Sequence, residues 1–250
     1  MLELKGLGVS YGAHRVIEGL DLCLEEGRVV GLLGPNGCGK SSLIRSIAGA
    51  QRHDGVVSYR GLVGQGLRDL IGYMPQEIPG HVVLTALEAV LVAARRGGSV
   101  WRVRRKEVEH AYQALASLGV GRLANTYLGE CSGGQRQLIS LAQTLVGDPS
   151  LVLLDEPTSA LDLKHQVRVL ARVREHVMDA ARHRLALVAL HDINLGVRFC
   201  DELVLMTDGA VMVQGTVDQV CTGEHLSRVY DTEVVVRVGD DGVRYAVALG

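Results

Sequence analysis

The sequence has few aromatic residues, no long apolar run and almost no net charge. Aromatic residues make up 4% of the 250 residues, so the core must consist mainly of Leu, Val, Ala and Ile. The best apolar runs, at 29–33, 151–154 and 185–190, are far shorter than the roughly 20 residues of a membrane-spanning helix. Short apolar runs of this kind are typical of buried parallel strands.

Cysteine pairs, a charge excess and a targeting segment are also missing. Five cysteines are scattered without a CxxC pair, which argues against a zinc site or a disulfide framework. The 26 basic and 28 acidic residues give a net charge of -2, so we expect no nucleic acid bound through bulk positive charge. The N-terminus MLELKGLGVS lacks the basic start and apolar core of a signal peptide, so we expect a cytoplasmic chain.

Hydrophobic periodicity predicts an α/β protein. Alternating residues in the first thirty positions predict two antiparallel strands joined near Gly12 and Ala13. From about 85 to 119 the pattern is helical, and we interpret this region as an inserted helical lobe. Further strands are expected at 28–33, 54–59, 70–74, 151–154, 185–190, 233–238 and 242–249. Further helices are expected at 40–50, 135–146, 164–180 and 192–199.

The segment GPNGCGKS at 34–41 fits G-x-x-x-x-G-K-[ST] between an expected strand and an expected helix. In such a loop Lys40 supplies a charge to the β and γ phosphates, and the Ser41 hydroxyl can ligate Mg²⁺. A Gly-rich turn with an accidental Lys-Ser pair is the alternative, which the flanking elements disfavour. The backbone N–H groups expected to surround phosphate oxygens are those of Asn36, Gly37, Gly39 and Lys40.

Two carboxylates follow the buried run at 151–154. We expect Asp155 to hold Mg²⁺ through water and Glu156 to accept a proton from an attacking water. An exposed turn ahead of Pro157 is the alternative, which the upstream phosphate loop disfavours.

A second glycine turn opens a helix at CSGGQRQ, residues 131–137. It is a second anion-binding helix end in the same chain, although one nucleotide does not need two phosphate cradles. We therefore predict that a second copy of the chain contributes this cradle, so that a symmetric pair shares two nucleotide sites.

Seven motifs in order make the chain resemble an ATP-binding cassette (ABC) subunit of a membrane transporter over essentially its whole length. They are Tyr11, the Walker A loop at 34–41, Gln76, the signature around Ser132, Walker B at Asp155 and Glu156, the D-loop at 159–162, and the switch histidine His191. The resemblance implies a P-loop NTPase core with an N-terminal antiparallel β subdomain and an inserted α-helical lobe. It makes 1–250 a single ATP-binding domain, with 1–84 and 148–250 as the core and about 85–147 as the lobe that carries the signature.

The resemblance also implies roles for single residues. Tyr11 would stack on adenine, with a core aromatic as the alternative. Gln76 would reach magnesium and the attacking water, and a plain turn glutamine is the alternative. His191 would hydrogen-bond the γ phosphate, although most histidines are surface or structural residues. Asp162 would lie at the subunit interface, or stabilise the dipole of the helix at 164–180, or both.

Two positions depart from the family pattern. Cys131 stands where the signature usually has Leu, and a small apolar side chain can pack there. Cys38 lies in the phosphate loop at a position that tolerates variation, and we expect no catalytic role for it.

The expected cofactors are ATP and Mg²⁺. The expected catalytic residues are Glu156, His191 and Gln76, and the expected metal-binding residues are Ser41, Gln76 and Asp155. The expected nucleotide-binding residues are Tyr11, Gly34, Pro35, Asn36, Gly37, Cys38, Gly39, Lys40, Ser41, Ser42, Ser132, Gly133, Gly134 and Gln135.

A less specific similarity favours the ATPases of bacterial importers for iron-siderophore, haem and vitamin B12 complexes. It lies in the segments EPTSALDLKHQ and ALHDINLGVRFCDELVLMTDGAVMVQG. That similarity implies a peripheral ATPase on the cytoplasmic side of the inner membrane, partnered by a second copy, by permease subunits and indirectly by a substrate-binding protein. The alternatives are a zinc, manganese or other small-solute transporter, a soluble ABC ATPase, or a regulator without turnover. A regulator is disfavoured by the presence of Glu156 and His191.

Overall fold

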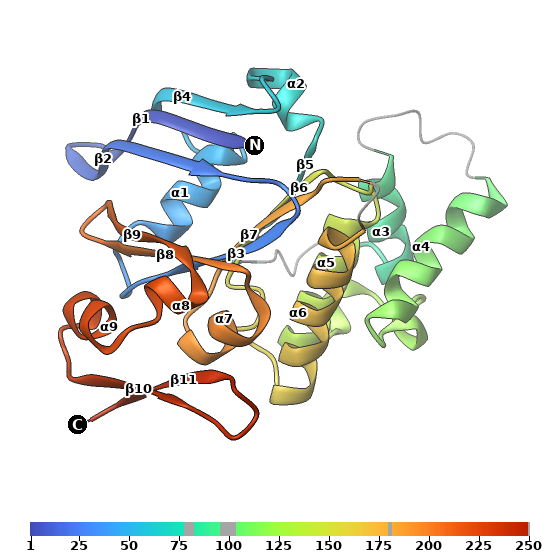
Figure 1. The fold of residues 1–250 in the computed structure, drawn as a ribbon. Coiled ribbons are helices and arrows are strands. Elements are labelled where there is room, and N and C mark those ends of the chain that lie inside the picture. The colour runs from blue at the N-terminus through green and yellow to red at the C-terminus, as the bar shows by residue number, and fades with distance from the viewer. Residues whose placement is uncertain (78–82, 96–103, 180–181, 250) are drawn as a thin grey trace.

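The computed structural model describes residues 1–77, 83–95, 104–179 and 182–249 (Figure 1). Its main sheet has the strand order β5-β6-β7-β3-β8-β9. The first five strands of this order run parallel, and β9 pairs antiparallel to β8. The bounds are β3 Arg28–Leu33, β5 Ile71–Met74, β6 Leu151–Asp155, β7 Leu185–Ala189, β8 Glu202–Thr207 and β9 Ala210–Thr216.

The predicted buried parallel strands are confirmed, and their side chains alternate between two cores. In β6, Leu151 and Leu153 belong to one hydrophobic cluster, whereas Val152 and Leu154 belong to the other. Because both faces are covered, apolar residues occupy successive positions along the strand.

A second sheet of order β2-β1-β4 lies on one side of the main sheet, beyond helix α1 (Figure 1). Strands β1 Leu2–Tyr11 and β2 His14–Leu24 form the predicted N-terminal hairpin, and β4 Asp54–Tyr59 pairs antiparallel to β1. Helix α1, Lys40–Ile47, contributes Leu43 and Ile44 to the core between the two sheets.

Helix α1 is three residues shorter than the predicted helix at 40–50. Gly49 has a φ of +70°, and Ala50 and Gln51 both donate to the carbonyl of Arg45, so the chain turns out of the helix there. The five-residue helix α2, Gly64–Arg68, was not predicted. Three other helices lie within a few residues of their predicted ranges: α5 Gly133–Leu145, α6 Leu163–Val177 and α7 Ile193–Phe199.

Helices α3, Ala86–Ala94, and α4, Arg105–Ser117, pack against α5 on the other side of the molecule from β1 (Figure 1). Two short 3-10 helices, Gly121–Leu123 and Leu128–Glu130, connect α4 to α5. Residues 96–103 of the predicted helical region lie outside the described residues. The bounds of the helical lobe, about 85–147, stay a prediction.

The C-terminal part contains two short helices and a hairpin. They are α8 Val217–Val220, α9 Gly223–Tyr230, β10 Val234–Val238 and β11 Arg244–Ala248. Strand β11 contacts α7, where the Asn194 side chain exchanges two hydrogen bonds with the backbone of Ala246. Over the described ranges, no helix combines the length and the apolar composition needed to cross a membrane.

Candidate functional site

The phosphate-loop segment connects β3 to α1. A Cβ atom at Gly34 would collide with the carbonyl oxygen of Met206, so the loop packs directly on β8. Helix α1 begins at Lys40, and its N-cap Gly39, with φ +104°, makes no side-chain cap hydrogen bond. The first amides of α1 therefore have no side-chain acceptor at the cap, and the positive end of the helix dipole favours an anion there.

The Lys40 side chain lies along this loop and is only 5% exposed. Its Nζ donates to the carbonyl oxygens of Gly34 at 2.7 Å and Pro35 at 2.9 Å. The neighbouring Cys38 is buried, with Sγ 3.9 Å from Lys40 Nζ. Burial raises the pKa of the Cys38 thiol, so the thiol stays protonated at neutral pH. Lys40 thus supplies a positive charge beside the loop.

Ser41 and Asp155 form a hydroxyl-carboxylate pair beneath the loop. Ser41 Oγ donates to Asp155 Oδ1 at 2.8 Å, and Asp155 is completely buried. Among the described groups, Oδ2 of Asp155 has no hydrogen-bond donor, and its nearest cation is Arg45 Nε at 3.8 Å. Burial raises the pKa of Asp155, against the lowering effect of the Ser41 hydrogen bond. Oxygen ligands of this kind are those that Mg²⁺ prefers, so these two residues fit a magnesium ion.

Glu156 directly follows β6 and has a φ of +54°, in the left-handed region that is uncommon for a non-glycine residue. Its Oε2 accepts a hydrogen bond from Gln76 Nε2 at 2.7 Å, and His191 Nε2 lies 2.5 Å from its Oε1. The structure therefore brings together the three predicted catalytic residues, from the ends of β5, β6 and β7.

The phosphate loop and the three predicted catalytic residues line one cavity of about 410 Å³. Every lining residue except Val16 belongs to the predicted site: Asn36, Gly37, Gly39, Lys40, Ser41, Ser42, Gln76, Glu156 and His191. Tyr11 lies beside it, with its hydroxyl 3.3 Å from Ser42 Oγ, and is 43% exposed. Tyr11 is therefore not a core residue, and its stacking on adenine stays a prediction.

The signature segment lies away from this cavity. It lines a separate cavity of about 460 Å³, together with Ala160, Leu161 and Asp162 of the D-loop. Ser132 is the N-cap of α5, where its Oγ accepts from Gln135 N and Gln135 Oε1 accepts from Ser132 N. Within one chain, the structure does not bring the signature to the phosphate loop.

Cys131 and Asp162 both have clear local roles. Cys131 is buried in the hydrophobic core, which confirms that a cysteine packs at this position. Asp162 is the N-cap of α6, and its Oδ1 accepts from His165 N at 2.9 Å. That hydrogen bond lowers the pKa of Asp162. The predicted helix-stabilising role is confirmed, and a place at a subunit interface stays a prediction.

Residues 17–159 match the family model described as ABC transporter. The chain belongs to the ABC transporter family. The hemin import ATP-binding protein HmuV of Pseudomonas aeruginosa is 37% identical over 248 residues, covering 95% of this ABC chain and 95% of that protein. The cobalamin import ATP-binding protein BtuD of Halobacterium salinarum is 31% identical over 254 residues, which cover 99% of this chain and 63% of that protein.

Solved structures of ABC proteins share the fold. An inward-facing transporter described as being of the metal-chelate ABC type matches with a TM-score of 0.84 and 27% identity, over 100% of this chain and 97% of that one. An ATP-binding cassette dimer in a post-hydrolysis state with ADP and phosphate matches with a TM-score of 0.77 and 26% identity, over 87% of this chain and 99% of that one. The predicted fold, an ABC-type P-loop NTPase, is confirmed.

Gln137 is a residue of this ABC cassette to which the sequence motifs assigned no role. It is 3% exposed, and its Nε2 donates to the carbonyl oxygen of Glu156 at 2.9 Å. Its position four residues before the buried Leu141 places a polar side chain on the buried face of α5. That placement is the feature of the sequence that singles it out.

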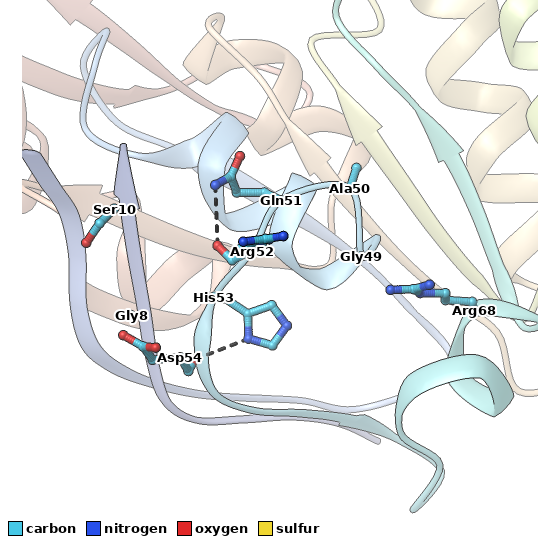
Figure 2. Close-up of a pocket in the computed structure, with 9 residues that line it drawn as sticks. All are labelled: Gly8, Ser10, Gly49, Ala50, Gln51, Arg52, His53, Asp54 and Arg68. Atoms are coloured by element: carbon cyan, nitrogen blue, oxygen red, sulfur yellow. Dashed lines mark hydrogen bonds between the residues drawn. The ribbon is translucent and has the colours of Figure 1, made fainter. Parts of the chain in front are cut away.

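A larger cavity, of about 560 Å³, lies beyond the C-terminal end of α1 of this cassette. Figure 2 shows its lining residues: Gly8, Ser10, Gly49, Ala50, Gln51, Arg52, His53, Asp54 and Arg68. None of these belongs to the predicted site. The converging polar groups, and not the size of the cavity, therefore mark the candidate nucleotide site.

Proposed function

We propose that this chain is the ATP-hydrolysing subunit of an ABC importer for haem, iron-chelate or cobalamin-type substrates. The proposal rests on the Glu156 carboxylate. It accepts a hydrogen bond from Gln76 and contacts His191 Nε2, at the cavity formed by the phosphate loop. The substrate class is supported by the names of the hemin and cobalamin relatives and by the metal-chelate type of the structural neighbour.

The geometry supports the following roles. The N-terminus of α1 and the Lys40 amine bind the β and γ phosphates of ATP. Ser41 and Asp155, with Gln76, would hold Mg²⁺. When bound, the metal ion neutralises negative charge on the phosphate oxygens.

Glu156 accepts the proton of the attacking water. The new bond joins the water oxygen to the γ phosphorus, the bond from that phosphorus to the bridging oxygen breaks, and ADP and phosphate leave. A carboxylate has about four lone-pair sites, so Glu156 can accept from Gln76 and His191 and still accept from water. Gln76 and His191 orient that water.

We also propose that the working unit is a head-to-tail dimer. In one chain the signature and the phosphate loop lie in separate cavities, so the Ser132 end of α5 is available to the nucleotide of a second copy. The structural neighbour solved as a cassette dimer supports this arrangement. We further propose that the dimer binds permease subunits on the cytoplasmic side of the membrane and acts indirectly with a substrate-binding protein. The importer names of the relatives support this part of the proposal.

Glu156→Gln tests the function. The amide oxygen of Gln can accept from Gln76 while its NH₂ group faces His191 Nε2, so the site keeps its shape but loses the base. We expect ATP binding to survive and hydrolysis to fall by on the order of a hundredfold or more. With ATP and Mg²⁺ the variant should accumulate as a dimer, and with ADP it should not, as measured by size-exclusion chromatography with light scattering.

Glu224→Gln is the matched control, because Glu224 is an exposed residue in the first turn of α9. It should hydrolyse ATP like the wild-type protein. Normal hydrolysis by Glu156→Gln, or loss of ATP binding together with turnover, would show that Glu156 is not the base.

A further inference from the structure

The Gln137 side chain on α5 makes three hydrogen bonds to the segment that follows β6. Its Nε2 donates to Glu156 O at 2.9 Å and to Ser159 Oγ at 3.3 Å, and its Oε1 accepts from Ala160 N at 3.1 Å. Both polar atoms of a buried amide are thus satisfied by the segment that follows β6. Such a side chain has one favourable orientation, because any other leaves buried polar atoms without partners.

These contacts fix the backbone of Glu156, the proposed catalytic base. The carbonyl oxygen of Glu156 also accepts from Ser159 Oγ at 3.2 Å and Ser159 N at 3.3 Å. The φ of +54° at Glu156 is strained for a non-glycine residue and persists only where neighbouring groups enforce it. The direction of the Glu156 side chain depends on this backbone conformation, so Gln137 helps to aim the carboxylate at the cavity.

The start of the same helix carries the signature. Ser132 is the N-cap of α5, and Gln137 follows five residues later, which spans about 7.5 Å along the helix. In the proposed dimer, Ser132 contacts the nucleotide of the second copy. The first turns of α5 therefore connect a contact with the partner's nucleotide to the catalytic base of the chain's own site.

We propose that Gln137 is a positioning residue that couples the signature end of α5 to the Glu156 carboxylate of the same chain. The inference rests on the proposed function, which supplies the role of Glu156 and the dimer. Signature contact with the partner's ATP stabilises the start of α5 and, through Gln137, the backbone of Glu156, so each site hydrolyses ATP faster when the neighbouring site holds ATP.

Gln137→Met is the first test, because Met has a similar length but makes none of the three hydrogen bonds. We expect kcat per nucleotide-binding site to fall roughly ten- to a hundredfold, the scale found for groups that orient a reactive group. The Kd for ATP should not change, because Gln137 does not line the phosphate-loop cavity. Normalising kcat to sites titrated with a fluorescent ATP analogue removes the effect of any unfolded fraction.

Gln143→Met is the matched control on the same helix. Gln143 Nε2 donates to Ala89 O at 3.2 Å, away from the site. It should retain the wild-type kcat and Kd. If Gln137→Met also retains the wild-type kcat per site, or if its Kd rises as much as its kcat falls, the inference is overturned.

Mixed dimers decide which site Gln137 serves. A dimer of one wild-type chain and one Lys40→Ala chain, isolated with two affinity tags, keeps one composite site. That site uses Glu156 of the Lys40 chain and Ser132 of the other chain. Gln137→Met on the wild-type chain, which keeps Lys40, should lower the rate of this reference dimer, whereas on the Lys40→Ala chain it should leave that rate unchanged. The reverse pattern, or an equal loss in both, refutes the coupling.

Failure of the proposed function gives a different result. Glu156→Gln would then hydrolyse ATP at the wild-type rate. Failure of the inference alone leaves Glu156→Gln inactive and Gln137→Met fully active.

Discussion

We expect Asp155→Asn to make the protein more stable in the absence of nucleotide and to abolish its response to Mg²⁺. Asp155 is completely buried at the end of β6, and its Oδ2 has no hydrogen-bond donor among the described groups. Asn keeps the shape and an oxygen that accepts from Ser41, and it removes the negative charge. A group kept for metal binding should cost stability when the metal is absent.

The magnitude follows from opposing contributions. An unsatisfied buried acceptor costs about 1–3 kcal/mol, and more when it is charged. Arg45 at 3.8 Å and the Ser41 hydrogen bond offset part of that cost. In the variant the Asn NH₂ group faces Arg45, whose side chain is 37% exposed and can turn toward water. We therefore expect a net gain of about 1 kcal/mol, which for a chain of this length raises Tm by about 2–4 °C.

The pH dependence has a defined sign. Burial raises the pKa of Asp155 in the folded state above its unfolded value. Above the folded pKa the wild-type protein carries the buried charge, and below the unfolded pKa both states are protonated and the cost is absent. The Tm advantage of Asp155→Asn is thus largest near neutral pH and shrinks as the pH falls through the folded pKa.

Asp162→Asn is a control that should change the stability of the folded state in the opposite direction. Because the His165 N–H lowers the pKa of Asp162, its charge stabilises the folded state above the unfolded pKa, and that stability is lost as the pH falls through the folded pKa. At neutral pH this variant should therefore be slightly less stable than the wild-type protein, although Asn also caps helices well.

The assay is thermal unfolding by circular dichroism across pH, with and without ATP, Mg²⁺ and EDTA. Wild-type Tm should rise more with ATP and Mg²⁺ than with ATP and EDTA, whereas Asp155→Asn should show no such difference. A variant with a lower Tm than the wild-type protein near neutral pH, or one that keeps the Mg²⁺-dependent increase, would refute the reasoning.

Two further predictions concern the phosphate loop and the signature. Lys40→Ala should abolish hydrolysis and severely weaken ATP binding while circular dichroism shows an intact fold, and turnover near the wild-type rate would contradict the assignment. Mixing Ser132→Arg chains with Lys40→Ala chains should restore one composite site per mixed dimer, so ATPase activity should return where each parent is inactive. Crosslinking of Cys38 and Cys131 of one chain at a single nucleotide would contradict the shared site.

The strands were the most predictable part of the fold. Strand β3 has its predicted bounds because an apolar run ends at a Gly-rich loop, and β4 has its predicted bounds between polar turns. Helix α2 was missed because its sequence GQGLR contains two glycines, which disfavour a helix in isolation. It forms in the protein where Leu67 packs into the core, and such tertiary packing leaves no local signature.

The site was predictable as a set of residues, but its contacts were not. Loop spacing places Lys40 and Ser41 together without any knowledge of the fold. The hydrogen bonds of Glu156 with Gln76, and of its backbone with Gln137, join residues that are distant in sequence. They depend on strand order and on how α5 packs against the segment after β6, which the periodicity of a single sequence does not contain.

The strand order explains why Glu156 is held from two sides. Strand β6 lies between β5 and β7, and all three run parallel, so their carboxyl ends meet at one edge of the sheet. Gln76 follows β5, and His191 follows β7. The residue after β6 therefore has a donor from each neighbouring strand. Asp155, the last residue of β6, points instead toward Ser41 of α1, and the left-handed backbone of Glu156 directs the next carboxylate elsewhere. Adjacent carboxylates thus serve different tasks, with Asp155 at the proposed metal position and Glu156 at the proposed water position.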